Sequence, residues 1–300
     1  MAPRQENLGR NFHAFIKEFA RNAVDFRIAV TTTDIFKEAG RFVGAPQIIS
    51  PQTPNLLEAF SANIKVGISG SPYEAGLEAA KMAIDRQSAA NSDLIAPCTA
   101  ACGASDSRCI ASCREAAGFQ FLRPEAYLYA IFVSDEEDRS SPEAKYYQRY
   151  FETAKDPGND AMVTAAAIAG DANASDCDAT WGRRYAEVAS LTGGVVGSIC
   201  DNNFSATLTK LASNAVGLNQ KFALQIRPNV ETVNVRVYYP CHIDSSHMSA
   251  CVSQNRDACV GVSGDSVELE CLVARGSENG WTYEPELNVV AFSGDAVPTR

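Results

Sequence analysis

Long apolar runs are missing from this sequence, and so is any excess of basic residues. No stretch reaches the roughly 18 consecutive apolar residues of a membrane-spanning helix. Lysine and arginine together number 26 against 36 aspartates and glutamates, for a formal net charge of −10. A nucleic-acid partner requires a basic face that neutralises phosphates. We therefore predict no transmembrane segment in this chain and no nucleic-acid ligand. Acidic clusters of this kind suit cations or basic protein surfaces.

Cysteine, by contrast, is plentiful. The chain has ten cysteines, an even number that predicts disulfides formed in an oxidising compartment. The alternative is a cytosolic protein with scattered buried thiols. Residues 1–6 have neither the charged leader nor the apolar core of an export signal. We predict an exported protein, whether extracellular, periplasmic or a cell-surface lipoprotein, whose signal segment lies upstream of this sequence.

Helical and strand patterns alternate over residues 1–222. Apolar residues at helical spacing predict a helix over residues 8–19, and alternation predicts a strand over residues 26–30. Residues 127–133 are apolar on both faces, as in a central parallel strand, and residues 162–169 form a second buried strand of small residues. Further helices are predicted over residues 56–63, 74–84, 183–191 and 204–216. This order predicts a doubly wound, mostly parallel, Rossmann-like α/β sheet.

From residue 223 the pattern changes to half-buried strands. Val233, Val235 and Val237 alternate with polar residues, and residues 267–273 and 281–292 are similar. We predict a small antiparallel β appendage over residues 223–300 that contains a disulfide loop.

Four cysteines spaced C-x3-C-x6-C-x3-C predict a helical hairpin inserted at about residues 92–118. The i,i+4 spacing puts each pair on one helix face. Folding the chain back between the pairs sets Cys98 opposite Cys113 and Cys102 opposite Cys109, which predicts two nested disulfides. The outer disulfide, Cys98–Cys113, is expected to stabilise the folded state by about 3 kcal/mol in the chain-entropy model. The alternative is a structural zinc ion bound by four thiolates.

The other six cysteines predict three more disulfides. We expect Cys177 to pair with Cys200. The last four have three possible connectivities, of which we favour Cys241–Cys271 with Cys251–Cys259. His242 and His247 lie in this region, where exposed histidines seldom form a metal cluster.

Four stretches stand out in the first 220 residues: VDFRIAVTTTD at 24–34, GSPYEAGLEAA at 70–80, IFVSDEED at 131–138 and AIAGD at 167–171. In their residues and their order they resemble the von Willebrand factor A family, in particular its secreted bacterial members, and the likeness covers roughly residues 1–220. The resemblance implies a sheet with a metal ion-dependent adhesion site at the carboxyl ends of its strands, where open α/β sheets bind ligands.

The family's metal ligands match this sequence in part. Ser71 stands where the family has a threonine, and Asp135 matches the aspartate that ends the central strand. Thr33, Asp34, Glu136 and Asp138 are expected on the rim of the site. The family's Asp-x-Ser-x-Ser motif does not occur at the start of this chain, and Met1 resembles the methionine that follows it. We therefore expect that the chain lacks the first strand and its three ligands.

The residue types suit a hard cation. Mg²⁺, Ca²⁺ and Mn²⁺ take oxygen ligands, and hydroxyl ligands leave the ion with residual charge that accepts a carboxylate from a partner. The resemblance thus implies an adhesion-type domain that binds a protein offering a carboxylate, with a site that is incomplete in this truncated chain. The cofactor is then Mg²⁺, Ca²⁺ or Mn²⁺ in the complete form, and we expect this truncated chain alone to bind none. The alternative is a metal-independent structural or interaction domain of a secreted protein.

In the family the first strand lies between the strands that match residues 26–30 and 127–133. Its loss leaves two open, apolar strand edges. We expect either that these two strands pair directly or that the natural protein has an upstream segment.

An enzyme is the remaining alternative, and we predict none. Residues 67–72 form a loop between a strand and a helix, as in a phosphate loop or a nucleophile elbow of a hydrolase. No lysine follows as a phosphate loop requires, the fifth position is Ser71 rather than glycine, and His13, His242 and His247 lie outside catalytic motifs. We therefore assign no catalytic residue.

Overall fold

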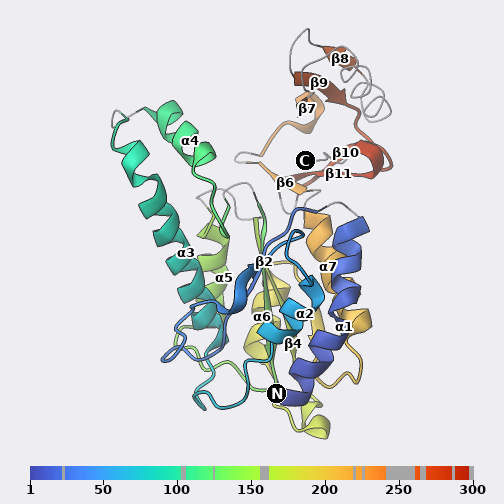
Figure 1. Cartoon of the computed structure of the whole chain (residues 1–300). Helices are drawn as coiled ribbons and strands as arrows, with labels where there is room; N and C mark the ends of the chain where they lie inside the picture. The colour runs from blue at the N-terminus through green and yellow to red at the C-terminus, as the bar shows by residue number, and fades with distance from the viewer. Residues whose placement is uncertain are drawn as a thin grey trace. The chain divides into compact units, whose positions relative to one another are not determined.

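The structure is a computed structural model in which helices and strands alternate through most of the chain (Figure 1). It describes residues 1–21, 24–102, 106–123, 126–155, 162–218, 221–224, 227–240, 261–263, 268–285 and 288–296. Two compact units make up the chain: the first comprises Met1–Pro157 and Met162–Val216, and the second comprises Gly217–Arg300 with Gly158–Ala161. In the described residues, no helix is long and apolar enough to cross a membrane.

A parallel three-stranded sheet forms the centre of the first unit. Its order is β3 (Leu128–Ser134), β4 (Val163–Ala169) and β5 (Val196–Ser198). Alternate side chains of a strand point to opposite faces, and each face of β4 joins its own apolar cluster: Ala166 and Ile168 belong to one, Ala165 and Ala167 to the other. All seven residues of β4 are buried. The prediction of a mixed α/β unit with a parallel sheet is confirmed.

Helices cover both faces of this sheet. The cluster with Ile168 is filled from α1 (Ala2–Arg21), α2 (Leu56–Asn63) and α7 (Ser205–Leu218), and the opposite cluster from α3 (Gly76–Thr99), α5 (Ala144–Thr153) and α6 (Arg183–Leu191). The apolar stripe on α1 explains its position, because Phe12, Phe15 and Phe19 are all buried against this core. Helix α3 is longer than predicted and continues past Pro97 to Thr99.

Two further strands pair apart from this sheet. β1 (Ile28–Val30) and β2 (Val43–Ile49) form an antiparallel pair, with Ile28 opposite Ile49. Direct pairing of β1 with β3, one of the two arrangements expected from the sequence, is wrong, because the described part of β1 bonds only to β2 and that of β3 only to β4. Each of these two strands therefore has one open edge among the described residues.

Two disulfides close the helical hairpin of α3 and α4 (Ser107–Ala116). They join Cys98 to Cys113 and Cys102 to Cys109, and we call these four residues the hairpin cysteines. Asp106 begins α4, since its carboxylate accepts the backbone N–H of Cys109 at 3.0 Å. The hairpin has few apolar contacts of its own, because Leu94 is 51% exposed. The disulfides are therefore its main cross-links.

The named strands in the described residues of the second unit are short and antiparallel. One sheet has the order β10 (Trp281–Glu284), β11 (Val289–Phe292) and β6 (Lys221–Ala223). The other has β7 (Val235–Pro240), β9 (Glu268–Val273) and β8 (Gly261–Ser263). Cys271 on β9 is disulfide-bonded. Residues 241–260 fall outside the described ones, and with them Cys241, Cys251, Cys259, His242 and His247.

Candidate functional site

Three loops meet at the carboxyl end of β3. The loop after β1 bonds to the segment before α3, where the Ala75 N–H donates to the Thr33 carbonyl at 3.0 Å. That segment bonds to the loop after β3, where the Arg139 N–H donates to the Glu74 carbonyl at 2.8 Å. The loop after β4 joins them, since the Thr180 N–H donates to the Asp135 carbonyl at 2.9 Å. We call these loops together the edge site.

Asp135, predicted as a metal ligand, binds two cationic groups of its own chain. Its Oδ2 lies 2.7 Å from the Met1 ammonium and 3.1 Å from Nη1 of Arg4. Both partners are largely buried, with 14% of the Asp135 side chain exposed and 18% of the Arg4 side chain. Arg4 also donates to the carbonyl of Cys177, so the guanidinium spans the loops that follow β3 and β4. The carboxylate is therefore already neutralised by protein groups.

The Cys177–Cys200 disulfide fixes the carbonyl that receives Arg4. It joins the short helix Ala174–Cys177 to the segment after β5. The Cα atoms of the two residues lie 5.6 Å apart, within the usual range for a disulfide. This bond holds the loop after β4 against the edge of the sheet. It thereby positions one of the two acceptors of the Arg4 guanidinium.

Ser71 and Asp34 are tied to each other. Asp34 is buried, and its carboxylate accepts backbone N–H groups from Phe36, Lys37 and Ser71, each at 2.9 Å. These bonds, with the one from Lys37 the largest cause, lower the pKa of Asp34 below its usual 3.8. The Ser71 hydroxyl accepts the Tyr73 N–H at 3.0 Å. In the described residues no hydrogen bond joins Ser71 to Asp135.

The other acidic residues after β3 have structural partners. Glu136 lies 3.8 Å from the Arg139 guanidinium, and both are exposed. Glu137 accepts the N–H groups of Arg183 and Arg184 at the start of α6, a common role for a carboxylate at a helix N-terminus. The expected rim therefore contains one exposed carboxylate in Glu136, whereas Glu137 is used inside the fold.

Asp138 is fully buried, although the sequence placed it on the rim. Its carboxylate accepts the Leu77 N–H at 3.1 Å and the Ser140 hydroxyl at 2.8 Å, and it lies 3.1 Å from Nε of Arg184. Burial raises the pKa of Asp138, while the hydrogen bonds act in the opposite direction. This residue holds the first turn of α3 against the loop after β3. It therefore shapes the edge site without facing its surface.

Sequence reasoning missed Glu74 and Arg4. The Glu74 carboxylate accepts the Ser134 hydroxyl at 3.0 Å. Burial, followed by the neighbouring charges of Glu136 and Asp135, raises the pKa of Glu74, and the Ser134 bond partly offsets this. Its place just before α3 was the signal available in the sequence. No local sequence pattern marks Arg4, because 131 residues separate it from Asp135.

Large apolar side chains surround the edge site on its exposed side. Phe36 in the loop after β1 is 73% exposed, Ile68 before α3 is 71% exposed and Trp181 after β4 is 51% exposed. The ring of Tyr73 lies 6.1 Å from that of Phe36. Exposed apolar residues grouped around polar ones are typical of protein-binding surfaces. We call Phe36, Ile68, Tyr73 and Trp181 the apolar rim.

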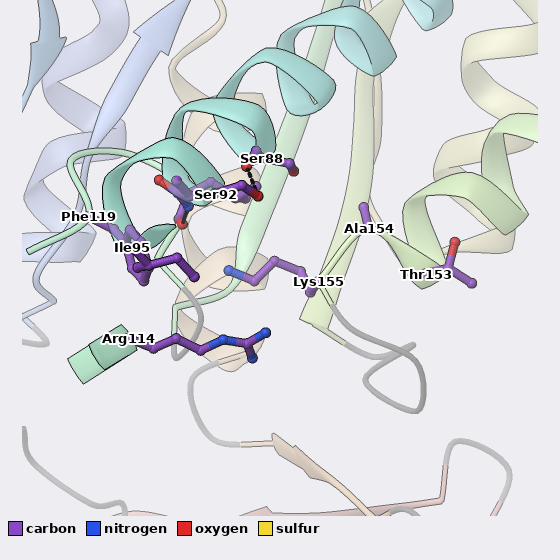
Figure 2. Close-up of a pocket in the computed structure, with 10 residues that line it drawn as sticks. Ser88, Ser92, Ile95, Arg114, Phe119, Thr153, Ala154 and Lys155 are labelled. Atoms are coloured by element: carbon purple, nitrogen blue, oxygen red, sulfur yellow. Dashed lines mark hydrogen bonds between the residues drawn. The ribbon is translucent and has the colours of Figure 1, made fainter. Parts of the chain in front are cut away.

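A hollow of about 230 Å³ lies elsewhere on the first unit. It is lined by residues of α3, α4 and α5 and by Phe119 and Leu122, which precede β3 rather than follow it. Figure 2 shows Lys155 and Arg114 extending into this space beside α3. The Lys155 ammonium donates to the Arg123 carbonyl, and Asn91 donates to the Leu122 carbonyl at 2.6 Å. These groups fix the segment that leads into β3, away from the edge site.

The oxygen atoms at the edge site are of the type that a hard divalent cation takes. In this chain, however, Asp135 binds Arg4, Asp34 binds backbone N–H groups, and the Ser71 hydroxyl accepts a bond from its own loop. These residues alone therefore do not fit a metal ion as they are arranged here. No protein-family model matches the chain, and neither a curated protein nor a solved structure matches it.

Proposed function

We propose that this chain is a von Willebrand factor A-type binding domain of an exported protein, and that a further strand between β1 and β3 completes its divalent-metal site. The family resemblance of the sequence motivates this proposal. The observation that carries it is the pair of open strand edges, since in the described residues β1 bonds only to β2 and β3 bonds only to β4.

Contacts at both ends of β1 support its position beside β3. Before β1, Arg27 donates to the carbonyls of Phe119 and Gln120, and Asp25 pairs with Arg123, all in the segment that precedes β3. After β1, Thr33 is joined to Ala75, in the segment that also contacts the loop after β3. The two strands thus run in the same direction.

The side chains of β1 and β3 support the proposal that another strand lies between their open edges. Ile28 and Val30 of β1 and Tyr129 and Val133 of β3 pack against the same apolar cluster. Ile131 of β3 is 36% exposed, whereas Ala166, its partner on β4, is fully buried. A central strand that is apolar on both faces is normally covered by neighbours. A parallel strand in this position would supply that cover and the missing backbone hydrogen bonds.

The position of Met1 at the start of α1 indicates where the proposed strand would join the chain. The Met1 nitrogen lies 2.7 Å from Asp135, at the carboxyl end of β3. Residues joined to Met1 on its amino side would therefore pass Asp135 before entering the open space. We infer that a loop at this point carries the Asp-x-Ser-x-Ser ligands, that Asp135 and Ser71 act with them, and that the metal takes the charge-balancing role that Arg4 has here.

The apolar rim favours a protein partner. In the complete form the cation would hold a carboxylate of the partner, and the apolar rim would supply the surrounding contact. The second candidate is a metal-independent interaction domain that uses the same face. The Arg4–Asp135 pair favours it, because this pair neutralises Asp135 without a metal.

The decisive experiment combines sequence and calorimetry. The reading frame upstream of Met1 should encode an apolar strand that ends in Asp-x-Ser-x-Ser. The chain extended by that segment should bind one Mg²⁺ or Mn²⁺ ion, and Ser71→Ala or Asp135→Ala should weaken binding by roughly tenfold or more. Asp93→Ala on the exposed face of α3 is the matched control and should leave affinity unchanged. No heat from the extended chain would exclude the metal site and leave the metal-independent domain.

A further inference from the structure

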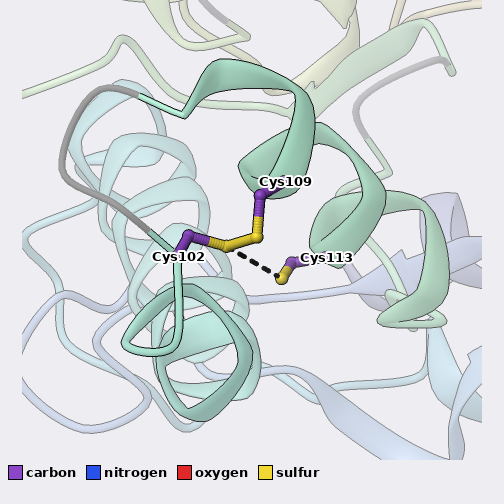
Figure 3. Close-up of side chains that lie close together, drawn as sticks. All are labelled: Cys102, Cys109 and Cys113. Carbon is purple, nitrogen blue, oxygen red and sulfur yellow. Dashed lines mark hydrogen bonds between the residues drawn. A yellow bond between two sulfur atoms is a disulfide. The ribbon is translucent and has the colours of Figure 1, made fainter.

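The hairpin cysteines bring three sulfur atoms together far from the edge site, and the fourth, that of Cys98, is bonded to the sulfur of Cys113. Figure 3 shows the Cys102–Cys109 disulfide with the sulfur of Cys113 beside it. The sulfur atoms of Cys102 and Cys113 lie 3.9 Å apart although they belong to different disulfides. The sulfurs of Cys102, Cys109 and Cys113 all lie within 4.8 Å of one another.

We propose that the reduced hairpin binds one zinc ion through the thiolates of its four cysteines. A tetrahedral zinc site with Zn–S distances of about 2.3 Å places its sulfur atoms about 3.8 Å apart. The Cys102–Cys113 separation of 3.9 Å already has this value. The bonded sulfurs must separate to that distance, and the sulfur of Cys98, which lies outside the group within 4.8 Å, must move closer to the others; rotation of the side chains can provide both movements.

The helical spacing suits such a site. Cys98 lies in the last turn of α3 and Cys102 lies three residues past its end, whereas Cys109 and Cys113 are four residues apart on α4. Ligands at i and i+4 face the same side of a helix, as the two histidines of helical zinc motifs do. The three residues between Cys109 and Cys113 are therefore the expected number for two ligands on one helix.

The hairpin also requires a cross-link. Leu94 is 51% exposed, and Ile95 and Ile110 are only partly buried, so apolar contacts alone hold the two helices weakly. Cys113 is buried at 3% exposure, which places the sulfur cluster between the helices rather than on their outer faces. Zinc under reducing conditions and the two disulfides under oxidising conditions would thus hold α3 and α4 together at the same place.

The chemistry balances with a dithiol as reductant. Two dithiol molecules are each oxidised to a cyclic disulfide, and together they deliver four electrons and four protons to the two protein disulfides, which become four thiols. Zn²⁺ then displaces the thiol protons to solvent as the four Zn–S bonds form, because only the thiolate binds the metal. In an oxidising compartment two molecules of a small disulfide accept four electrons from the four thiolates and are reduced to thiols with protons from solvent, which restores the two protein disulfides and releases the ion.

Cobalt and zinc titrations of the reduced, full-length chain test this site. After reduction under anaerobic conditions, Co²⁺ should give the absorption of a tetrahedral thiolate site, one Zn²⁺ should displace it, and native mass spectrometry should show the bound zinc. Cys109→Ser should weaken zinc binding by at least roughly tenfold, since even loss of an indirect partner of a metal has that effect. The matched control is Cys177→Ser combined with Cys200→Ser, which should bind as the unmodified chain does.

A second measurement covers variants that fail to fold. In the unmodified reduced chain, zinc should slow alkylation of the hairpin cysteines and leave that of Cys177 and Cys200 unchanged. Uniform alkylation, an absent cobalt spectrum, or a spectrum that Cys109→Ser leaves intact would each overturn the proposal. The result is independent of the edge site, whose ligands are oxygen atoms.

Discussion

Arg4→Met tests whether a positive charge is required beside Asp135. Methionine keeps most of the side-chain length of arginine and removes the guanidinium that lies 3.1 Å from Asp135. The carboxylate then keeps only the Met1 ammonium at 2.7 Å. The matched control is Arg10→Met on the same helix, since Arg10 lies 3.8 Å from Glu6 in a pair whose side chains are 65% and 58% exposed.

The size of the effect follows from burial. Breaking a buried ion pair costs about 3–5 kcal/mol, because one charge remains without its partner. The Met1 ammonium still neutralises part of the Asp135 charge, so we expect a loss of about 1–3 kcal/mol in the free energy of unfolding. For a unit of this size, that loss lowers Tm by roughly 2–12 °C. The exposed Arg10 pair should contribute at most about 1 kcal/mol.

Thermal unfolding followed by circular dichroism, with and without Mn²⁺, measures both the destabilisation caused by Arg4→Met and the change in Tm that the cation produces. A cation that takes the place of the guanidinium stabilises the folded chain by about 2.7 kcal/mol at a concentration of 100 times its Kd. In the chain extended by the upstream segment that completes the site, we therefore expect Mn²⁺ to raise the Tm of Arg4→Met more than that of the chain without this substitution. Equal destabilisation by Arg4→Met and Arg10→Met would refute the role of the pair, and an equal Mn²⁺ response would refute the exchange of one cation for another.

Three further predictions concern the acidic residues around the edge site. Asp138→Ala should cost about 3–5 kcal/mol in urea unfolding, because it leaves Arg184 buried without its carboxylate, whereas Asp93→Ala should change little. Asp34→Asn should lower the free energy of unfolding by about 1–3 kcal/mol at neutral pH. The difference from the unmodified chain should shrink as pH falls below 3.8, because folding lowers the pKa of Asp34 and its carboxylate stops stabilising the fold once it is protonated. Glu74→Gln should behave oppositely and gain relative stability as pH rises above 4.5, because folding raises the pKa of Glu74. A pH-independent difference in both variants would contradict these assignments.

Local patterns allowed much of the first unit to be predicted. The predicted helices over residues 56–63 and 183–191 coincide with α2 and α6, because both elements depend on one apolar face. The three cysteine pairs joined in the described residues are those that the spacing indicated. These features involve residues close in the sequence or on adjoining elements.

Features that depend on distant partners were not predicted. The Arg4–Asp135 pair joins residues 131 positions apart, and no local pattern marks it. The buried role of Asp138 depends on α3 and α6 meeting the same loop, whereas the sequence shows only a run of acidic residues. The separate pairing of β1 with β2 likewise depends on sheet topology, which strand patterns do not specify.

The small side chains of β4 have a consequence for where this protein can be strengthened. Four of its seven residues are alanines, and the segment that follows α6 lies so close that a Cβ on Gly194 would overlap the Ala165 carbonyl. Larger side chains on this strand would push the helices outward, since a packed interior does not yield easily. The bulk that fills the interior comes instead from the helices, through Tyr147, Phe151 and Tyr185. Attempts to raise heat resistance would therefore gain most from the outer faces and ends of those helices, with the alanine strand left untouched.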